Sequence, residues 1–546
     1  LTFTPKFNND DHFFTTMVRM EINNGDGSGY GTLSHGLPTS NIESPTTQGQ
    51  LKDMWTNQSQ WRSVYFAYQG HYSYKSKYAL TLTSRLDGST KFGPGNRWGF
   101  FPSISGRWNI SDEEFMEDLD WLSMLSIRPG FGQVGAPPGA EYLHFSRYSS
   151  TDRYGDMSAT RPNNVRLSDL KWETKTTWNI GTDVGILDDK FTMDVNIYSQ
   201  LTEDLLMKDV RIPSSTGYGS LSWKNVGSMR NKGWELNIHG NKFIQVGDFS
   251  TNFNLTLGNN VNEIVKMDET VLASLNSDFN YENGKYLTRV QVANAFGSIY
   301  GFRYKGVYQY SDYIPGEQEN APVARDASGN VITDEKGEPL PMVFNYGSTT
   351  AQPYEFQGGD AIYEDVNHDG NINELDIVYL GNCNPLLTGG FGMRFNYKRF
   401  SLNMQFNYRY GSKVLNIAKM NAENMHNNNN QSYAVNWRWR TEGDVTDIPR
   451  ALHLAGYNFL GSDRFVEDGS FCRLNYMQFS YNLEPEIAKR LGIRKAMFSV
   501  SANNLFNWTR YSGVDPEVGY GGMGLSTDNA QTPRAKSFTC RLKVTF

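Results

Sequence analysis

The chain has 546 residues, of which 38% are hydrophobic and 20% are charged, and its formal net charge is -7. This acidic balance and the lack of a basic stripe argue against nucleic acid as a partner. The mean hydropathy of -0.56 and the lack of a long uninterrupted apolar run argue against a helical membrane protein.

Aromatic residues make up 14% of the chain, including 31 Tyr and 12 Trp. This content is typical of the aromatic girdles at the two surfaces of a membrane, and a large aromatic β core is the alternative. The three cysteines, Cys383, Cys472 and Cys540, are scattered and odd in number. They indicate neither a disulfide framework nor a thiolate metal site.

Strict alternation of apolar and polar residues predicts the strands. From Phe191 to Ile197 every second residue is apolar, and the pattern returns at 400–410, at 477–483 and at 538–546. About ten alternating residues are enough to cross a bilayer, whereas strands of soluble sandwiches are usually shorter. The pattern therefore predicts an all-β protein, an antiparallel transmembrane β-barrel, ahead of a sandwich or a propeller.

Short turns and long loops alternate along the chain. Outer-membrane barrels keep short turns at the periplasmic side and long loops outside the cell, so this alternation orients the strands. It predicts about fifteen strands, the last ending at the periplasmic side at Phe546. The predicted short turns are Asn8–Asp11, Tyr74–Ser76, Leu187–Lys190, Phe243–Asp248, Lys398–Arg399 and Pro485–Ile493. The predicted long loops are 27–59, 136–170, 203–229, 260–385, 412–470 and 509–534.

The loop at about 260–385 is predicted to be a large extracellular insertion, in which Ser298–Tyr310 is loop structure rather than a barrel strand. Single-chain bacterial barrels have an even number of strands with both ends in the periplasm, so an odd count indicates that strands are missing. A plugged transporter has 22 strands, which would place about seven strands and the plug domain before Leu1. Residues 1–546 are therefore interpreted as the C-terminal part of the barrel.

A calcium-type loop is predicted inside the insertion, from Asp365 to Asp376. Oxygen-bearing side chains at loop positions 1, 3, 5, 9 and 12, with Gly370 at position 6, follow the spacing of an EF-hand loop. Asp376 replaces the usual glutamate at position 12, which resembles dockerin-type loops. The alternative is an Asx-rich turn without an ion. The predicted Ca²⁺ ligands are Asp365, Asn367, Asp369, Asn371, Asn373 and Asp376.

Aromatic residues in two loops are the candidate substrate-binding residues. Tyr433, Trp437 and Trp439 follow an asparagine run, and flat rings beside amides would suit a glycan. A period of two would place Trp437 and Trp439 on one face of an extended segment. Trp55 and Trp61, at the end of the first long loop, have the same interpretation. The alternative for all of them is packing against the barrel or a partner.

Catalytic motifs are lacking. The eight histidines form no H-E-x-x-H motif, and the chain contains no G-x-S-x-G elbow. Pairing any two of the many carboxylates as a glycosidase dyad would be arbitrary without geometry. The chain is therefore not predicted to be an enzyme.

Several segments together resemble one family, the SusC/RagA-like TonB-dependent outer-membrane transporters. Each segment is weakly specific alone, but their order across nearly the whole chain is specific. The segments are Arg85–Gly93, Asn96–Gly99, Phe101–Ser103, Lys171–Glu173, Trp178–Gly181, Asn225–Gly227, Asn231–Glu235, Gly297–Gly301, Asn503–Phe506 and Asp515–Glu517.

The resemblance implies a function and a set of partners. It implies a plugged barrel in the bacterial outer membrane that pairs with a SusD-like surface lipoprotein and imports oligosaccharides or peptides with energy from the TonB complex. Whether two transporter–lipoprotein pairs associate is left open. The alternatives are a secreted β-rich carbohydrate-binding or hydrolytic protein, and an adhesin or purely structural barrel.

Overall fold

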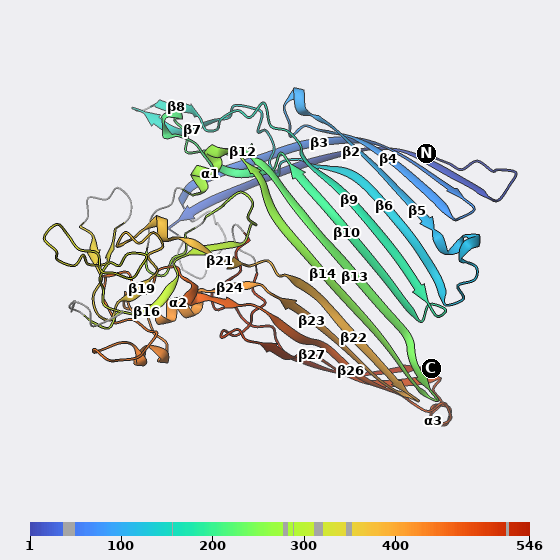
Figure 1. Cartoon of the computed structure of the whole chain (residues 1–546). Helices are drawn as coiled ribbons and strands as arrows, with labels where there is room; N and C mark the ends of the chain where they lie inside the picture. Colours follow the sequence, from blue (N-terminus) through green and yellow to red (C-terminus); the bar gives the residue numbers. More distant parts are fainter. Residues whose placement is uncertain are drawn as a thin grey trace.

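The computed structural model describes residues 1–36, 50–155, 157–276, 282–287, 289–310, 320–345, 352–519 and 524–546. Its main feature is one sheet of 15 strands in which each strand pairs with the next sheet strand along the chain (Figure 1). All of these pairs are antiparallel. The predicted number and direction of the strands are confirmed.

The strands of the large sheet are β1 (Thr2–Phe3), β2 (His12–His35), β3 (Gln50–Tyr74), β4 (Tyr78–Ser89), β5 (Trp98–Asn109), β6 (Leu122–Ala136), β9 (Glu173–Ile186), β10 (Phe191–Glu203), β13 (Gly227–Val246), β14 (Phe249–Met267), β22 (Leu387–Tyr397), β23 (Phe400–Tyr410), β26 (Phe471–Asn482), β27 (Lys495–Thr509) and β29 (Ser537–Thr545).

Short strands and helices lie in the connections. The strands are β7 (Tyr148–Tyr154), β8 (Met157–Pro162), β11 (Leu206–Arg211), β12 (Ser220–Asn225), β15 (Ser298–Gly301), β16 (Tyr304–Val307), β17 (Val343–Phe344), β18 (Tyr354–Glu355), β19 (Ala361–Tyr363), β20 (Asn371–Ile372), β21 (Val378–Asn382), β24 (Lys413–Asn416), β25 (Val466–Asp468) and β28 (Thr527–Asp528). The helices are α1 (Glu269–Leu275), α2 (Ile417–Glu423) and α3 (Pro485–Arg490). Among the described residues, no helix is both long and apolar enough to cross a membrane.

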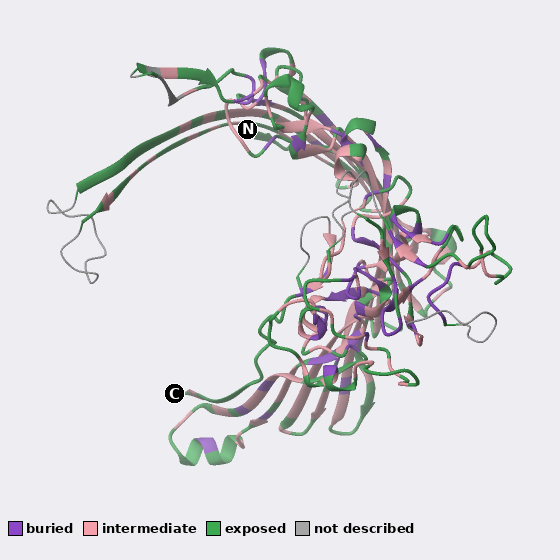
Figure 2. Cartoon of the chain, turned by 90° about the vertical axis from the view of Figure 1, so that its left-hand side faces the viewer, coloured by how far each residue is buried: buried purple, intermediate pink, exposed green. Residues whose placement is uncertain are grey.

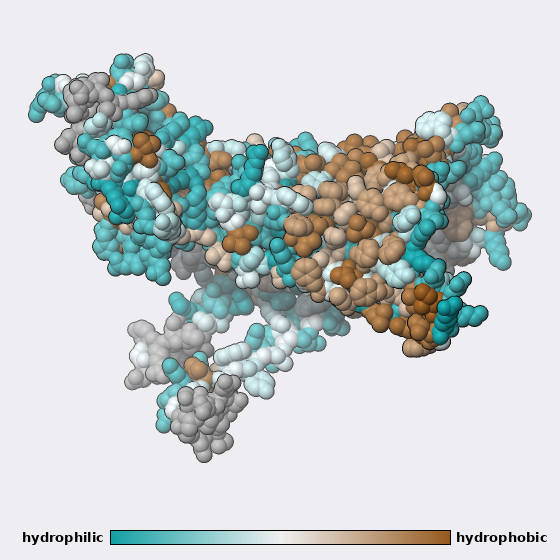
Figure 3. All heavy atoms as spheres, turned by 90° about the horizontal axis from the view of Figure 1, so that it is seen from below, coloured by the Kyte–Doolittle hydropathy of each residue, from teal (hydrophilic) through white to brown (hydrophobic). Residues whose placement is uncertain are grey.

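The sheet curves into an arc (Figure 2), and its convex face carries apolar side chains. Trp178, Ile180 and Ile197 on this face are 61%, 58% and 60% exposed, and apolar residues cover a broad area of it (Figure 3). A soluble sheet protein would cover such a face with a second layer. Here the face is suited to hydrocarbon, as expected for the wall of a membrane barrel.

The concave face carries polar side chains that bond to one another across strands. Arg128 of β6 donates to Asp183 of β9 at 2.7 Å and also to Asp194 of β10. Ser126 donates to the second carboxylate oxygen of Asp183 at 2.8 Å, and Asn196 donates to Asp194 at 2.7 Å. Alternation thus places a paired polar network on the side of the sheet that faces the barrel lumen.

Short turns join the strands at the end of the sheet away from the large loops. The chain reverses at Lys75–Ser76, at Leu187–Asp189 and at Lys398, and these residues have left-handed φ values between 51° and 58°. Three of the predicted turns are thereby confirmed. Within the predicted turn Pro485–Ile493 the chain forms α3, with Pro485 in its first turn.

The first predicted long loop, 27–59, is wrong. β2 and β3 remain paired as far as His35 and Gln50, and only residues 37–49 of this region lie outside the described residues. β4 pairs with β3 only from Ser63 onward. Beyond that point β2 and β3 therefore form a two-stranded ribbon that projects past the sheet (Figure 1).

Glycine and tryptophan together explain this ribbon. Gly25 and Gly31 lie directly opposite Trp61 and Trp55, and each indole ring lies where the side chain of the opposing glycine would be. A large ring over a glycine backbone restores the packing that the glycine lacks. The glycines therefore continue the strand, although their number predicted a loop.

The insertion between β14 and β22 forms its own small sheets. β14 continues to Met267, opposite Gly227, before it leaves β13. In Ser298–Tyr310, β15 and β16 pair with β21 and β19, and neither joins the large sheet. A buried cluster in this insertion includes Phe302, Phe344 and Ile372. The main buried cores of the chain thus lie in the loops, because the sheet itself is a single layer.

We predict that Gly389→Ala destabilises the barrel wall. A methyl group at Gly389 would overlap the carbonyl oxygen of Thr256 and lie 2.7 Å from the Tyr408 hydroxyl. Overpacking of this kind typically costs about 1–3 kcal/mol. The full-length protein in detergent should lose its unheated gel migration at a lower temperature than wild type.

The control for this prediction is Gly258→Ala on the neighbouring strand. A methyl group there would meet its nearest atoms at 3.8–3.9 Å, which is ordinary contact. If both variants melt at the wild-type temperature, the close approach of β14 and β22 at Gly389 is contradicted.

Candidate functional site

Two of the predicted substrate-binding aromatics form an exposed pair. Tyr433 and Trp437 are 75% and 59% exposed, and their ring centroids are 4.7 Å apart with an interplanar angle of 80°. They lie at the two ends of the 3-10 helix Tyr433–Trp437. The chain turns here because Val435 is buried with Met420 and Phe459 in a core of the loops.

Trp439 does not join this pair, so the prediction of an extended segment with Trp437 and Trp439 on one face is wrong. The Trp439 ring occupies the space above Gly359, where φ is 86°. Its indole nitrogen is buried and has no hydrogen-bond partner among the described residues. Trp439 therefore packs one part of the loops against another.

Trp55 lies elsewhere, on the projecting ribbon. Its side chain is 56% exposed and covers Gly31. Within the described part of the chain, Trp55 makes no ring contact with Tyr433 or Trp437. The four predicted residues are thus one exposed pair, one packing residue and one ribbon residue.

In the Asp365–Asp376 loop, the carboxylate of the first residue accepts backbone N–H groups from the same loop. The Asp365 carboxylate accepts the N–H of Asp369 at 3.3 Å and of Gly370 at 2.7 Å. Gly370 has φ 81°, which a side chain would strain. Asp376 is fully buried and accepts the N–H of Val366 and of Asn373 at 2.7 and 2.8 Å.

The negative charges of this loop favour binding of a cation. Burial, together with the negative charges of Asp365 and Asp369, raises the pKa of Asp376 to about 6. The Asn371 side-chain oxygen is buried and lacks a hydrogen-bond partner among the described residues. However, in the described ranges no three His, Cys, Asp or Glu side chains are grouped so that they could hold a metal. Calcium binding therefore stays a prediction.

A cavity of about 510 Å³ lies at the loop end of the concave face, among β2, β3 and β4. Its charges are paired. Glu21 accepts from Tyr65, from Asn23 at 3.0 Å and from Arg19 at 2.5 Å. The other charged and aromatic residues that line it are Trp61, Arg85, Asp87, Lys91 and Trp172.

The basic residues of this cavity also have partners. Arg85 bonds to Asp87 at 2.6 Å and stands 4.2 Å from the centre of the Tyr65 ring. Lys91 donates to the Pro138 carbonyl at 3.2 Å and lies 3.7 Å from Glu141. Sequence reasoning missed this cavity because its residues come from β2, β3, β4 and β6 and from the connecting segments. The signals in the sequence were Trp61, predicted as a candidate substrate-binding aromatic, and the segments Arg85–Gly93 and Lys171–Glu173, which resemble a family.

Segments that carry the family resemblance meet beside the cavity. The Asn225 side chain accepts the Lys171 N–H at 2.9 Å and donates to the Lys171 carbonyl at 3.1 Å. The Trp172 ring lies 4.7 Å from Phe92 and 5.6 Å from Phe101. These segments therefore join the loops to the rim of the wall.

The last of these segments, Asp515–Glu517, anchors the C-terminal loop. Arg473 of β26 is 2% exposed and bonds to Asp515 at 2.6 Å, with Glu517 at 3.6 Å. Burial would raise the pKa of Asp515, but the Glu517 N–H and the Arg473 guanidinium together lower it. Glu517 also pairs with Arg534 at 2.6 Å. This buried network fixes the loop that follows β27.

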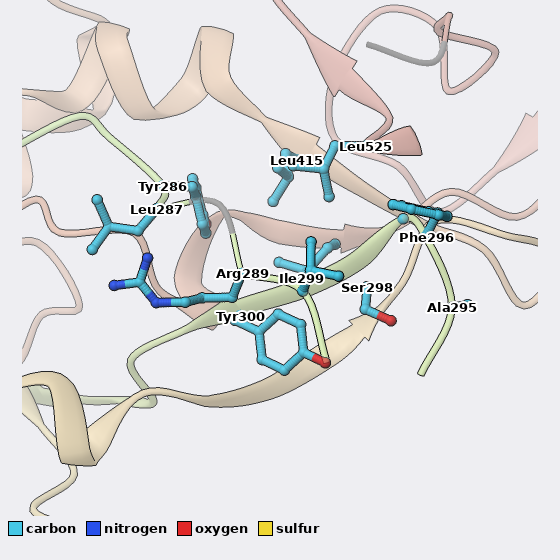
Figure 4. A pocket seen from close by; sticks show the side chains of 12 residues that line it. Tyr286, Leu287, Arg289, Ala295, Phe296, Ser298, Ile299, Tyr300, Leu415 and Leu525 are labelled. Carbon is cyan, nitrogen blue, oxygen red and sulfur yellow. The ribbon is translucent and has the colours of Figure 1, made fainter. Parts of the chain in front are cut away.

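A second enclosed cavity, beside Ile299, Leu415 and Leu525, is too small for a substrate (Figure 4). Its volume is about 10 Å³, which is at the lower limit for one water molecule. The cavity of about 510 Å³ among β2, β3 and β4, called the rim cavity below, and the exposed pair Tyr433 and Trp437 are therefore the candidate sites for a larger ligand.

A curved antiparallel wall with an apolar outer face, a polar inner face and all large loops at one end defines an outer-membrane β-barrel protein. The chain belongs to the TonB dependent receptor-like, beta-barrel family, which matches residues 2–334. It is thus a protein of the bacterial outer membrane, and the secreted alternative is not supported.

Relatives agree with this assignment. TonB-dependent receptor P39 of Formosa agariphila is 29% identical over 504 residues, covering 87% of this chain and 45% of that protein. TonB-dependent receptor SusC of Bacteroides thetaiotaomicron is 28% identical over 505 residues, covering 89% of this chain and 44% of that protein. The chain thus spans about half the length of these relatives.

The fold is that of a solved transporter. The structure of the RagAB peptide transporter has a TM-score of 0.77 at 21% identity, covering 100% of this chain and 54% of that chain. The closed-closed state of the RagAB peptide importer gives 0.75 at the same identity, with 55% of that chain covered. At this identity the likeness shows the fold alone.

We predict that Arg473→Ala loosens the C-terminal loop. Two carboxylates with 13% and 19% exposed side chains would lose their buried cation, and breaking such a pair typically costs about 3–5 kcal/mol. Limited proteolysis of the full-length protein should cut within 509–534 at least tenfold faster than in wild type.

Arg19→Ala is the matched control for this test. Arg19 pairs with Glu21 but its side chain is 59% exposed, so its loss is expected to cost at most about 1 kcal/mol. Equal cleavage rates for both variants and the wild type would show that the Arg473 network does not hold the loop.

Proposed function

We propose that the chain is the barrel wall of a TonB-dependent importer that takes an oligosaccharide or a peptide across the outer membrane. A SusD-like surface lipoprotein would bind over the loops, and the TonB complex would supply the energy for import. The observation that carries the proposal is the rim cavity. It lies on the polar face of the wall at the loop end, where a substrate entering the lumen from outside would pass.

The chemistry of the surfaces favours an oligosaccharide over a peptide. Tyr433 and Trp437 expose flat rings outside the wall, and rings of this kind stack on apolar faces of sugars. In the rim cavity, Glu21, Asp87 and Lys91 each have an oppositely charged neighbour. A neutral, hydroxyl-rich ligand would need no new ion pairs there. The RagAB structures are of a peptide importer, so a peptide is the second candidate.

We further propose that the Asp365–Asp376 loop holds Ca²⁺. The support is the spacing of its six oxygen-bearing side chains, the left-handed Gly370 and the buried carboxylate of Asp376. A bound ion would neutralise these carboxylates and stiffen the insertion. No catalytic role is proposed for it.

Growth and uptake experiments test the import proposal. Deletion of the gene should abolish uptake of one member of a panel of labelled neutral oligosaccharides and peptides. The double variant Tyr433→Ala/Trp437→Ala should reduce that uptake by roughly tenfold, because each lost aromatic contact is worth about 0.5–1.5 kcal/mol. Phe115→Ala, which removes a ring that is 67% exposed in the connection between β5 and β6, should leave uptake unchanged.

The same strains test the partner. The full-length protein, purified from outer membranes in detergent, should carry a surface lipoprotein identified by mass spectrometry. Unchanged uptake of every probe after deletion, with no lipoprotein bound, would contradict import and favour the adhesin or structural barrel.

Isothermal titration of the full-length protein with calcium chloride tests the calcium proposal. Extracellular calcium modules bind with Kd values of roughly 10⁻⁴–10⁻³ M, and a Kd in this range is expected. Asp369→Ala should weaken binding at least tenfold. Asp334→Ala should not, since Asp334 accepts the Lys336 and Glu338 N–H groups in a separate turn of the same insertion. Equal binding by Asp369→Ala and wild type would reject the site.

A further inference from the structure

The convex face of the wall contains an apolar groove of about 900 Å³ that extends across strands from β4 to β14. This volume is in the upper part of the range for ligand pockets, roughly 300–1,000 Å³. The lining is mostly apolar, and Asn179, Tyr198, Ser199, Lys232 and Asn259 are its polar residues. The apolar residues used below are Phe131, Trp178, Ile180, Ile197, Trp234 and Val261.

Strand register explains why the wall is hollow here. One cross-strand row runs from Lys232 through Ser199 and Trp178 to Phe131. In this row the small Ser199 lies between the long Lys232 and the Trp178–Phe131 pair, whose ring centroids are 4.4 Å apart. The next row, from Trp234 through Ile197 to Ile180, is apolar throughout. The groove thus follows from the register of the strands and from the side chains that the register places side by side.

Lys232 lies on the rim of the groove toward the loops. β13 begins at Gly227 beside the long loops and ends at Val246 beside a short turn, so Lys232 is near the outward end. Its side chain lies on the same face as Trp234, and it makes no ion pair within the part of the chain that the structure describes. An unpaired ammonium group on the lipid face is costly, so Lys232 is expected to pair with an anionic group of a membrane lipid.

We propose that the groove binds one molecule of the phosphorylated glycolipid that forms the outer leaflet of this membrane. Its acyl chains lie along Ile180, Ile197 and Trp234, because hydrocarbon is the only medium available to an apolar groove at that depth. Its phosphate lies at Lys232, and Trp178 contacts the headgroup region as interfacial tryptophans do. The position of Lys232 toward the loops favours this glycolipid over a glycerophospholipid of the inner leaflet.

Native mass spectrometry of the full-length protein, extracted from outer membranes in mild detergent, tests the proposal. Wild type should retain one phosphorylated glycolipid per barrel. Lys232→Gln and Lys232→Glu should reduce the retained fraction by about fivefold or more, the effect of one lysine on an anionic lipid. Ser199→Trp should reduce it independently by filling the groove.

Two control variants should retain the lipid. Lys336→Glu changes the net charge by the same amount as Lys232→Glu but lies in the insertion, and Met20→Trp adds an indole on the convex face of β2, outside the groove. Unheated gel migration identifies any variant that does not fold, and Lys232→Gln is the least disruptive of the set.

Three results would overturn the proposal. The first is retention by the Lys232 and Ser199 variants equal to that of the controls. The second is a glycerophospholipid as the retained molecule. The third is a wild-type dimer without lipid that Ser199→Trp converts to monomer, which would make the groove an interface between two copies of this chain.

Discussion

Hydrogen bonding of the backbone is the constraint on which the rest of this structure depends. Inside a bilayer an unpaired N–H or C=O costs several kcal/mol, so each strand must bond along its length to both neighbours. From β3 to β27, each strand of the sheet pairs with one strand on either side, in chain order. Once the strands are paired, the alternation of apolar and polar residues determines which side chains lie on each face of the sheet. Asp183 and Asp194 must then meet Arg128 on one face, and Trp178 and Ile197 must meet lipid on the other.

The wall and the loops of this chain are stabilised in different ways. The wall is a single layer and has little buried core of its own. The loops, in contrast, are packed like small soluble domains, with clusters around Phe302 and Met420 and a buried ion pair between Asp360 and Arg450 at 2.7 Å. The segments that resemble the family join these two parts. Asn225 and Trp172 fasten the loop bases to the rim, and Asp515 does so through Arg473.

Local patterns predicted the wall well, because a strand between lipid and water repeats every two residues and short turns such as those at Asp188 and Lys398 separate its strands. They failed where tertiary packing overrides local composition. The glycines of β2 indicated a loop, but Trp55 and Trp61 of β3 cover them. Trp437 and Trp439 suggested an extended segment, but burial of Val435 winds the chain into a 3-10 turn. The rim cavity depends on how four strands and their connections come together, which no single segment reveals.

Pairing between successive sheet strands has a consequence for how such a protein diversifies. Residues 268–386 separate β14 from β22, yet these strands pair as directly as β22 and β23 do across a tight turn. The entropy of closing a flexible loop grows only logarithmically, by about 0.6 kcal/mol for each doubling of its length. A connection that supplies its own buried core can therefore lengthen or be exchanged while the ladder beneath it is unchanged. Outward recognition and membrane assembly can thus change independently within one polypeptide.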